Sequence, residues 1–159
     1  MGLLAARNAG VEVPDSSIDG ALKYIKKLTS ADTGAVGYSG MGGLAGSGAR
    51  SAIACLVFAI GKQKDWKDFE GTKKFLIDSI DSPSQQHWSY YERYYKAQAL
   101  FQADYKSWQQ WNRNTVRLLR TMQTDDGCIG NSGHGKAYST SMSSLALALN
   151  YRFLPIYER

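Results

Sequence analysis

Apolar residues recur at helical spacing along most of this chain, and segments that are apolar on one side alternate with segments that are apolar nearly all round. Residues 18–28, IDGALKYIKKL, have their apolar side chains on one face. Residues 49–60, ARSAIACLVFAI, are apolar almost throughout, whereas residues 66–80, WKDFEGTKKFLIDSI, again carry charges on one side. A helix that is apolar on one side only, here called one-sided, covers a core, whereas a helix that is apolar all round lies inside it. The alternation therefore predicts outer and inner helices.

The second half of the chain continues this alternation. Residues 89–103, SYYERYYKAQALFQA, are rich in aromatic residues, with Glu92 and Lys96 spaced as an ion pair on a narrow polar stripe. Residues 105–123 are one-sided, and residues 138–150 are small and apolar. No pair of strand patterns is joined by a hairpin turn. We predict an all-α fold with six or seven helices, and expect residues 1–159 to form one domain, either alone or within a longer chain.

Each one-sided helix carries a similar pair of large residues near its end, which indicates an internal repeat. The pairs are Tyr24-Ile25, Phe75-Leu76 and Leu118-Leu119. After the first and third pairs the chain runs similarly, as TSADTGAVG and QTDDGCIG. In this alignment Thr29 corresponds to Gln123, and Gly34 corresponds to Gly127.

These copies resemble the QW motif of the prenyltransferase and squalene-oxidase repeat superfamily. In that motif a pair of large residues is followed by Gln, Gly and Trp. Only the third copy keeps the glutamine, Gln123, and the closing Trp is replaced by Val36 and Ile129. The second copy lacks the glycine, although Trp88 follows it. A bacterial branch of the superfamily, of unknown activity, is also similar to residues 1–14, 89–102 and 138–159. The resemblance implies an arc of an α/α toroid with alternating outer and inner helices.

The aromatic residues around 88–95 are the candidate site. They cover more than one face of their helix, so some must point away from the outer helices, and in a toroid that direction is the central cavity. Such a wall suits an isoprenoid or a glycan. The candidate ligand-binding residues are Trp88, Tyr91, Tyr94, Tyr95 and Tyr138. We expect a binding or scaffold module, with an enzyme acting on an isoprenoid or a glycan as the alternative.

Asp126, Cys128 and His134 are residue types that bind zinc, yet they lie in a glycine-rich stretch. The zinc-dependent prenyltransferases of the superfamily carry an Asp-Gly-Cys-like pair at the start of an inner helix, whereas here it precedes that helix. We interpret the stretch as a turn in which Gly127 has a positive φ. We therefore expect no metal and no other cofactor.

No catalytic residue is assigned from the sequence. The Asp-x-Asp-Asp motif of the class II cyclases is missing, and neither His87 nor His134 stands at a recognisable spacing from a nucleophile. The glycine-rich residues 34–50 precede an apolar helix and have no P-loop lysine, so we interpret them as a long turn.

The charge pattern bears on possible partners. The net charge is +5, but basic residues occur singly or in pairs among acidic ones, so we expect no nucleic-acid binding. The longest apolar run, residues 51–60, is too short to span a bilayer. No export signal is visible, and the sequence does not indicate a compartment. The apolar residues of segment 150–159, among them Phe153 and Ile156, favour self-association or docking on further repeats.

Overall fold

The computed structural model describes residues 1–40, 48–82, 88–130 and 133–151. Within these ranges the chain forms helices and two isolated β-bridges but no β-strand, which confirms the all-α prediction. The helices are α1 (Gly2–Asn8), α2 (Asp15–Leu28), α3 (Gly48–Ile60), α4 (Lys67–Asp78), α5 (Ser89–Ala103), α6 (Tyr105–Met122) and α7 (Lys136–Ala148), followed by the 3-10 turn η1 (Leu149–Tyr151).

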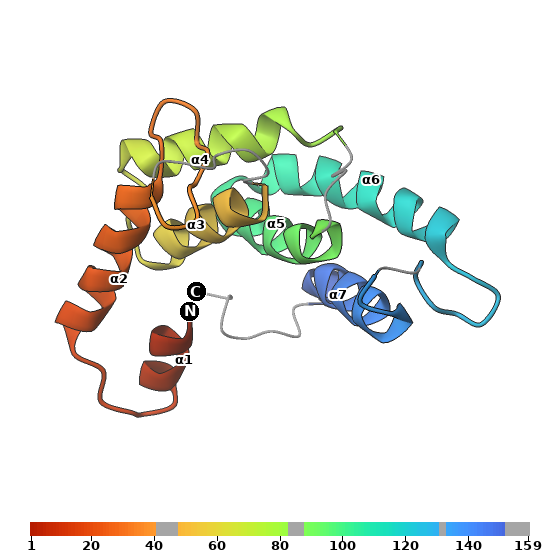
Figure 1. The fold of residues 1–159 in the computed structure, drawn as a ribbon, viewed down its shortest axis with the longest axis horizontal. Coiled ribbons are helices and arrows are strands. Elements are labelled where there is room, and N and C mark those ends of the chain that lie inside the picture. The colour runs from red at the N-terminus through yellow and green to blue at the C-terminus, as the bar shows by residue number, and fades with distance from the viewer. Residues whose placement is uncertain (41–47, 83–87, 131–132, 152–159) are drawn as a thin grey trace.

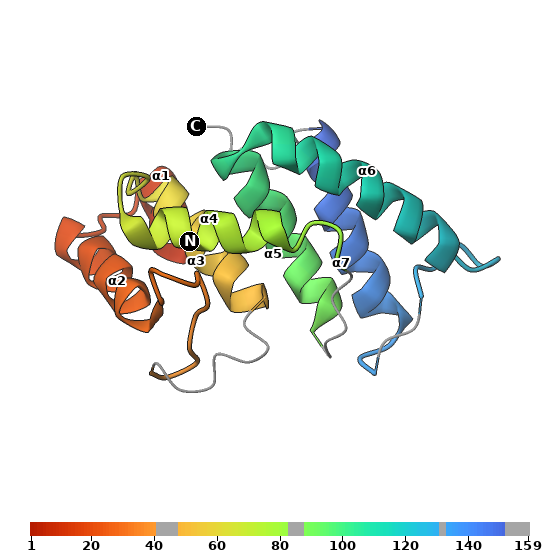
Figure 2. The same cartoon turned by 90° about the horizontal axis from the view of Figure 1, so that it is seen from above.

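The helices form two layers that follow the predicted alternation. Helices α3, α5 and α7 pack side by side, with α5 in the middle (Figure 1). Helix α4 lies on α3 and α5, and α6 lies on α5 and α7, so α4 and α6 together cover one side of α3, α5 and α7 (Figure 2). Helix α2 packs against α3, and the short α1 packs against α2.

Burial explains why the two kinds of sequence form two layers. Helix α3 buries Cys55, Leu56 and Phe58 completely, because α2, α4 and α5 all contact it. Helix α6 instead buries one stripe, which includes Trp108, Trp111 and Leu119. The chain turns sharply between α5 and α6, where the Asp104 carboxylate accepts a 3.0 Å hydrogen bond from the Ser107 amide and so caps α6.

The turns that follow α2 and α6 have the same construction. Thr29 forms an antiparallel bridge with Val36, and Gln123 forms one with Ile129. Both turns contain a glycine in the left-handed region, with φ of +68° at Gly34 and +81° at Gly127. The predicted positive φ of Gly127 is confirmed, and the pairing of the two turns is the one that the sequence alignment predicts.

Some predicted features lie outside the described residues. These are His87, residues 41–47 of the glycine-rich segment, and the apolar positions of residues 152–159. Among the helices that the structure does describe, none is long and apolar enough to cross a membrane.

Candidate functional site

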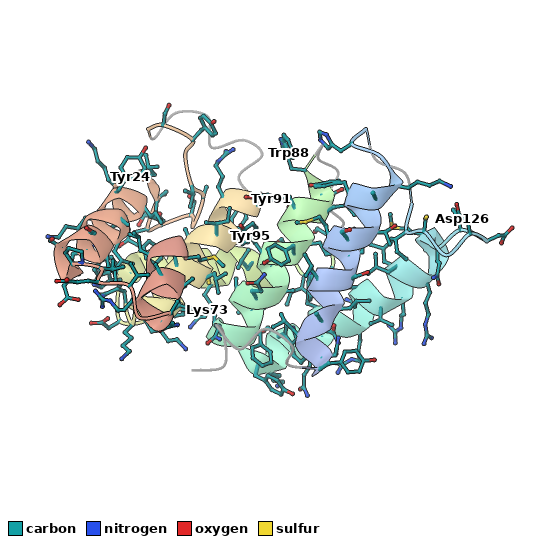
Figure 3. All side chains as sticks on the ribbon, turned by 90° about the horizontal axis from the view of Figure 1, so that it is seen from below. Tyr24, Lys73, Trp88, Tyr91, Tyr95 and Asp126 are labelled. Atoms are coloured by element: carbon teal, nitrogen blue, oxygen red, sulfur yellow. The ribbon has the colours of Figure 1, made fainter. Side chains whose placement is uncertain are left out.

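Four of the five candidate residues lie on helix α5 or at its N-terminus. Trp88 is the N-cap residue of α5, and Tyr91, Tyr94 and Tyr95 follow within the first two turns. Figure 3 looks at the side of the molecule that α4 and α6 leave uncovered, and Trp88, Tyr91 and Tyr95 are labelled along this side of α5. We call this surface, together with Tyr138, the aromatic face.

The rings of α5 contact one another in a continuous series. Trp88 and Tyr91 meet edge to face with ring centroids 6.5 Å apart, and Tyr91 meets Tyr95 at 4.8 Å in the same geometry. Tyr94 lies 4.9 Å from Tyr95, again edge to face. The Tyr91 and Tyr95 hydroxyls are 3.5 Å apart and share a hydrogen bond. Edge-to-face pairs of this kind hold rings in a fixed arrangement.

Helix α7 and the loop before it complete the aromatic face. His134 stacks on Trp88 with centroids 5.0 Å apart and planes inclined by 18°, and it also meets Tyr138 edge to face at 5.2 Å. Tyr138 in turn contacts the buried ring of Tyr90, which lies 6.2 Å away. The structure therefore brings all five candidate residues into one connected group.

The aromatic face combines exposed and buried polar groups. Trp88 is 52% exposed, and Tyr91, Tyr94 and Tyr95 are half-buried. The hydroxyl of Tyr138 is shielded from solvent and has no hydrogen-bond partner among the described residues. Burial raises the pKa of this phenol, and the neighbouring Tyr91 phenol raises it further. The group therefore stays protonated and remains a hydrogen-bond donor at neutral pH.

The other residues considered as zinc ligands form a turn. The Asp126 carboxylate accepts hydrogen bonds from the Lys136 ammonium at 2.7 Å, from the Thr124 hydroxyl and from the Cys128 amide. These donors lower the pKa of Asp126, with the largest effect from Lys136. His134 is engaged by Trp88 and Tyr138. Among the described residues no group of three or more His, Cys, Asp or Glu side chains could hold a metal ion.

Two members of the site were not predicted from the sequence. The sequence gives no sign that His134 belongs to the aromatic face, because its partner Trp88 lies far away along the chain. Tyr90 was not selected, yet its ring connects Tyr138 to Arg93, whose guanidinium carbon lies 5.0 Å from the ring centroid. The run of aromatic residues at 88–95 was the only local signal for either of them.

The polar stripe predicted from Glu92 and Lys96 is covered at Lys96, which is only 4% exposed. The charge of Glu92 still favours the protonated form of Lys96. Its ammonium donates 2.8 Å hydrogen bonds to the carbonyl and to the hydroxyl oxygen of Ser79, at the end of α4. Packing of α4 on α5 buries this side of the helix, and the spacing of two charges does not reveal such packing.

The arrangement favours binding by stacking and hydrogen bonding. Indole, imidazole and phenol rings present flat apolar surfaces, and the phenols add hydroxyl groups. Comparison of the chain with models of protein families, with curated proteins and with solved structures finds no match.

Proposed function

We propose that the protein is a binding module of the α/α-toroid repeat type, and that its aromatic face binds a glycan. The repeat assignment is supported by the two helical layers, which alternate along the chain, and by the matching turns at Thr29–Val36 and Gln123–Ile129. It is also supported by the pair of large residues near the end of each outer helix. In α6, for example, Leu118 is 38% exposed whereas Leu119 is buried.

The observation that carries the proposed function is the connected series of half-exposed rings from His134 through Trp88 and Tyr91 to Tyr95. Contiguous aromatic surface that stays accessible in a folded protein marks a binding site more often than a packing accident. The rings are held by one another, so little side-chain entropy is lost when a ligand stacks on them.

A glycan fits this face better than an isoprenoid. The C–H faces of a sugar stack on flat rings, while its hydroxyls exchange hydrogen bonds with phenols such as the Tyr91 and Tyr95 pair. An isoprenoid chain gains affinity by leaving water completely, which needs an enclosing apolar wall. Trp88, with half of its surface in solvent, offers an open platform.

Titration with oligosaccharides tests the proposal. Cellohexaose, xylohexaose and chitohexaose are added separately, and binding is followed by tryptophan fluorescence and by NMR. At least one should bind, and Trp88→Ala and Tyr95→Ala should each weaken it roughly tenfold, because each removes about 1–2 kcal/mol of ring contact. Tyr24→Ala removes a ring that is 57% exposed on the outer helix α2 and serves as the matched control. Equal affinities for the Trp88 and Tyr24 variants would refute the assignment.

An enzyme acting on an isoprenoid is the second candidate. The buried hydroxyl of Tyr138, which has no partner among the described residues, favours it, since such a phenol can donate a hydrogen bond to a substrate within an aromatic wall. Incubation with prenyl diphosphates and squalene, followed by mass spectrometry, distinguishes the two functions. Conversion that is lost in Tyr138→Phe would support the enzyme over the binding module.

A further inference from the structure

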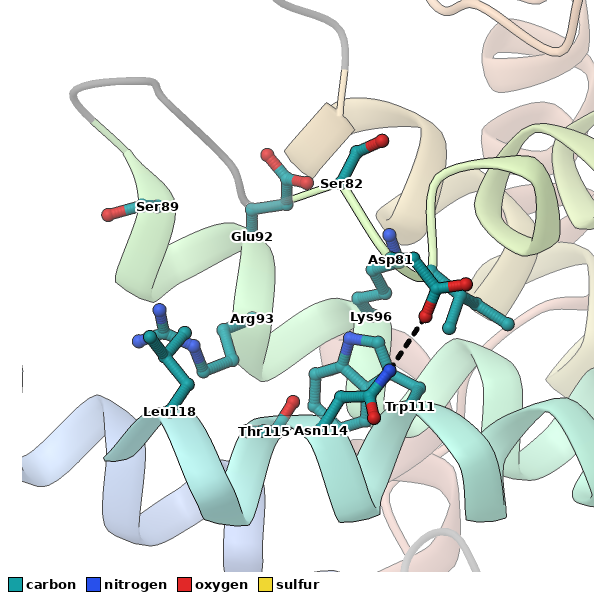
Figure 4. Close-up of a pocket in the computed structure, with 11 residues that line it drawn as sticks. Asp81, Ser82, Ser89, Glu92, Arg93, Lys96, Trp111, Asn114, Thr115 and Leu118 are labelled. Atoms are coloured by element: carbon teal, nitrogen blue, oxygen red, sulfur yellow. Dashed lines mark hydrogen bonds between the residues drawn. The ribbon is translucent and has the colours of Figure 1, made fainter. Parts of the chain in front are cut away.

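A cleft lies on the side of α5 opposite the aromatic face. It has a volume of about 270 Å³ and is bounded by α5, by α6 and by the residues that follow α4 (Figure 4). Its apolar wall comes mainly from Ile80, Trp111 and Leu118, and α5 contributes Arg93 and Lys96. Residues three apart on a helix lie on the same side, so the two cations face the cleft together.

One nitrogen of the Arg93 guanidinium is buried without an acceptor in the part of the chain that the structure describes. Its Nη1 atom is shielded from solvent and has no hydrogen-bond partner among the described residues. The guanidinium rests on the Tyr90 ring, a contact that supplies no acceptor for the Nη1 hydrogens. Burial lowers the pKa of Arg93, which reflects the cost of keeping the charge there. A buried donor of this kind is normally satisfied in the working state of a protein.

The acidic residues around the cleft have donors elsewhere. Asp81 accepts a 2.7 Å hydrogen bond from the Asn114 amide, drawn as the dashed line in Figure 4, and longer ones from Gln110. The Glu92 carboxylate lies against Gly48 in the first turn of α3, where a methyl group on that glycine would collide with it. A carboxylate at a helix N-terminus is stabilised by the helix dipole. Among the described residues neither acid accepts a hydrogen bond from Arg93, although the charge of Glu92 partly offsets the lowering of the Arg93 pKa.

We infer that the cleft binds a small organic monocarboxylate, with its carboxylate on Arg93 and its apolar part against Trp111 and Leu118. The planar guanidinium fork matches a carboxylate in shape and charge. A phosphate dianion fits less well, because Asp81 and Glu92 also line the cleft and would repel its second charge. The apolar wall favours an aromatic or short aliphatic acid over formate or acetate.

Lys96 supplies a second positive charge without direct coordination. Two of its three ammonium donors are used by Ser79, and burial lowers its pKa to about 8. An anion in the cleft would favour the charged form of this lysine and would itself be stabilised. The inference does not rest on the proposed glycan binding, since the cleft lies on the other face of α5 and uses none of the five aromatic candidates.

Benzoate and hexanoate are the probes. Each is titrated into the full chain while the Arg93 Nε–H and Trp111 indole N–H resonances are followed by NMR, up to about 20 mM. We expect saturable shifts of both signals. Arg93→Met should weaken binding by roughly tenfold or more, and Arg93→Lys by several-fold, because lysine keeps the charge but loses the fork. Arg113→Met removes the same charge from the exposed face of α6 and should change the affinity less than about twofold.

Each other outcome refutes the inference. If the Arg93 Nε–H signal or the Trp111 indole N–H signal does not shift, the cleft does not hold the carboxylate as inferred. Equal weakening by Arg93→Met and Arg113→Met would mean that only overall charge matters. Tighter binding of inorganic phosphate than of benzoate would contradict the assigned ligand class. Arg93→Lys keeps the test usable if the methionine variant does not fold, and circular dichroism checks both.

Discussion

Two glycines that occupy equivalent turns should respond very differently to the same substitution. Gly34 and Gly127 both have a positive φ. A Cβ at Gly127 would have no neighbour within 4 Å, whereas one at Gly34 would lie 2.5 Å from the carbonyl carbon of Gly71 and 2.8 Å from the Cβ of Phe75. The Gly127→Ala change therefore meets backbone strain alone. The Gly34→Ala change meets the same strain and also forces the turn away from α4.

The magnitudes follow from these contacts. Left-handed backbone costs an alanine about 1 kcal/mol, which is the whole expected loss for Gly127→Ala. Gly34→Ala should cost about 3 kcal/mol or more, since a contact with backbone atoms cannot be relieved by a side-chain rotation. Urea denaturation at 25 °C measures both changes in the free energy of unfolding. Equal losses would refute the docking of the first turn on α4, and no loss in Gly127→Ala would refute a constrained turn.

Four further predictions concern titration and assembly. Burial lowers the pKa of Lys96 to about 8, so the unfolded chain binds that proton more tightly than the folded chain does. The free energy of unfolding should therefore rise by about 1 kcal/mol between about pH 7 and pH 9. Urea melts of Lys96→Met should lack this rise. Burial raises the pKa of Cys55 to about 12, so stability should fall above about pH 9, and less in Cys55→Ala. An NMR titration should find Asp126 ionised below the usual carboxyl range, with a higher midpoint in Lys136→Met. Sedimentation at high micromolar concentration should detect self-association, and a stable monomer would contradict it.

The helices were the predictable part of the fold, because the apolar pattern of each helix is contained in its own sequence. The one-sided sequences of α2, α4 and α6 and the apolar sequence of α3 follow directly from the number of sides on which each helix is covered. The turn at Gly127 was predictable for a similar reason, because its glycine is required by local backbone geometry. Its counterpart in the first turn has an additional constraint, contact with Gly71, which no local pattern reveals.

The sites were predictable only in part, because their partners come from distant segments. The aromatic run at 88–95 indicated a binding surface, but His134 joins it from the loop before α7. The spacing of Glu92 and Lys96 predicts a polar stripe, because opposite charges four residues apart on an isolated helix attract each other. Packing by α4 changes the surroundings of Lys96 and provides Ser79 as its partner.

Helix α5 contributes residues to both proposed sites. Helices α3 and α7 flank it and α4 and α6 cover it, so its sequence cannot be one-sided. Its uncovered side carries the aromatic face, and its covered side carries Arg93 and Lys96. Tyr90 connects the two, since its buried ring contacts both Tyr138 and the Arg93 guanidinium.

This position leads to a prediction about coupling between the two proposed sites. Tyr90→Leu removes a ring that supports Tyr138 on one side and Arg93 on the other, so it should weaken oligosaccharide and benzoate binding together. Tyr95→Ala should weaken only the first, and Arg93→Lys only the second, because neither residue contacts the opposite site. The three variants are compared by the two NMR titrations already described. If Tyr90→Leu weakens the binding of only one of the two ligands, the ring supports that site and merely fills space beside the other.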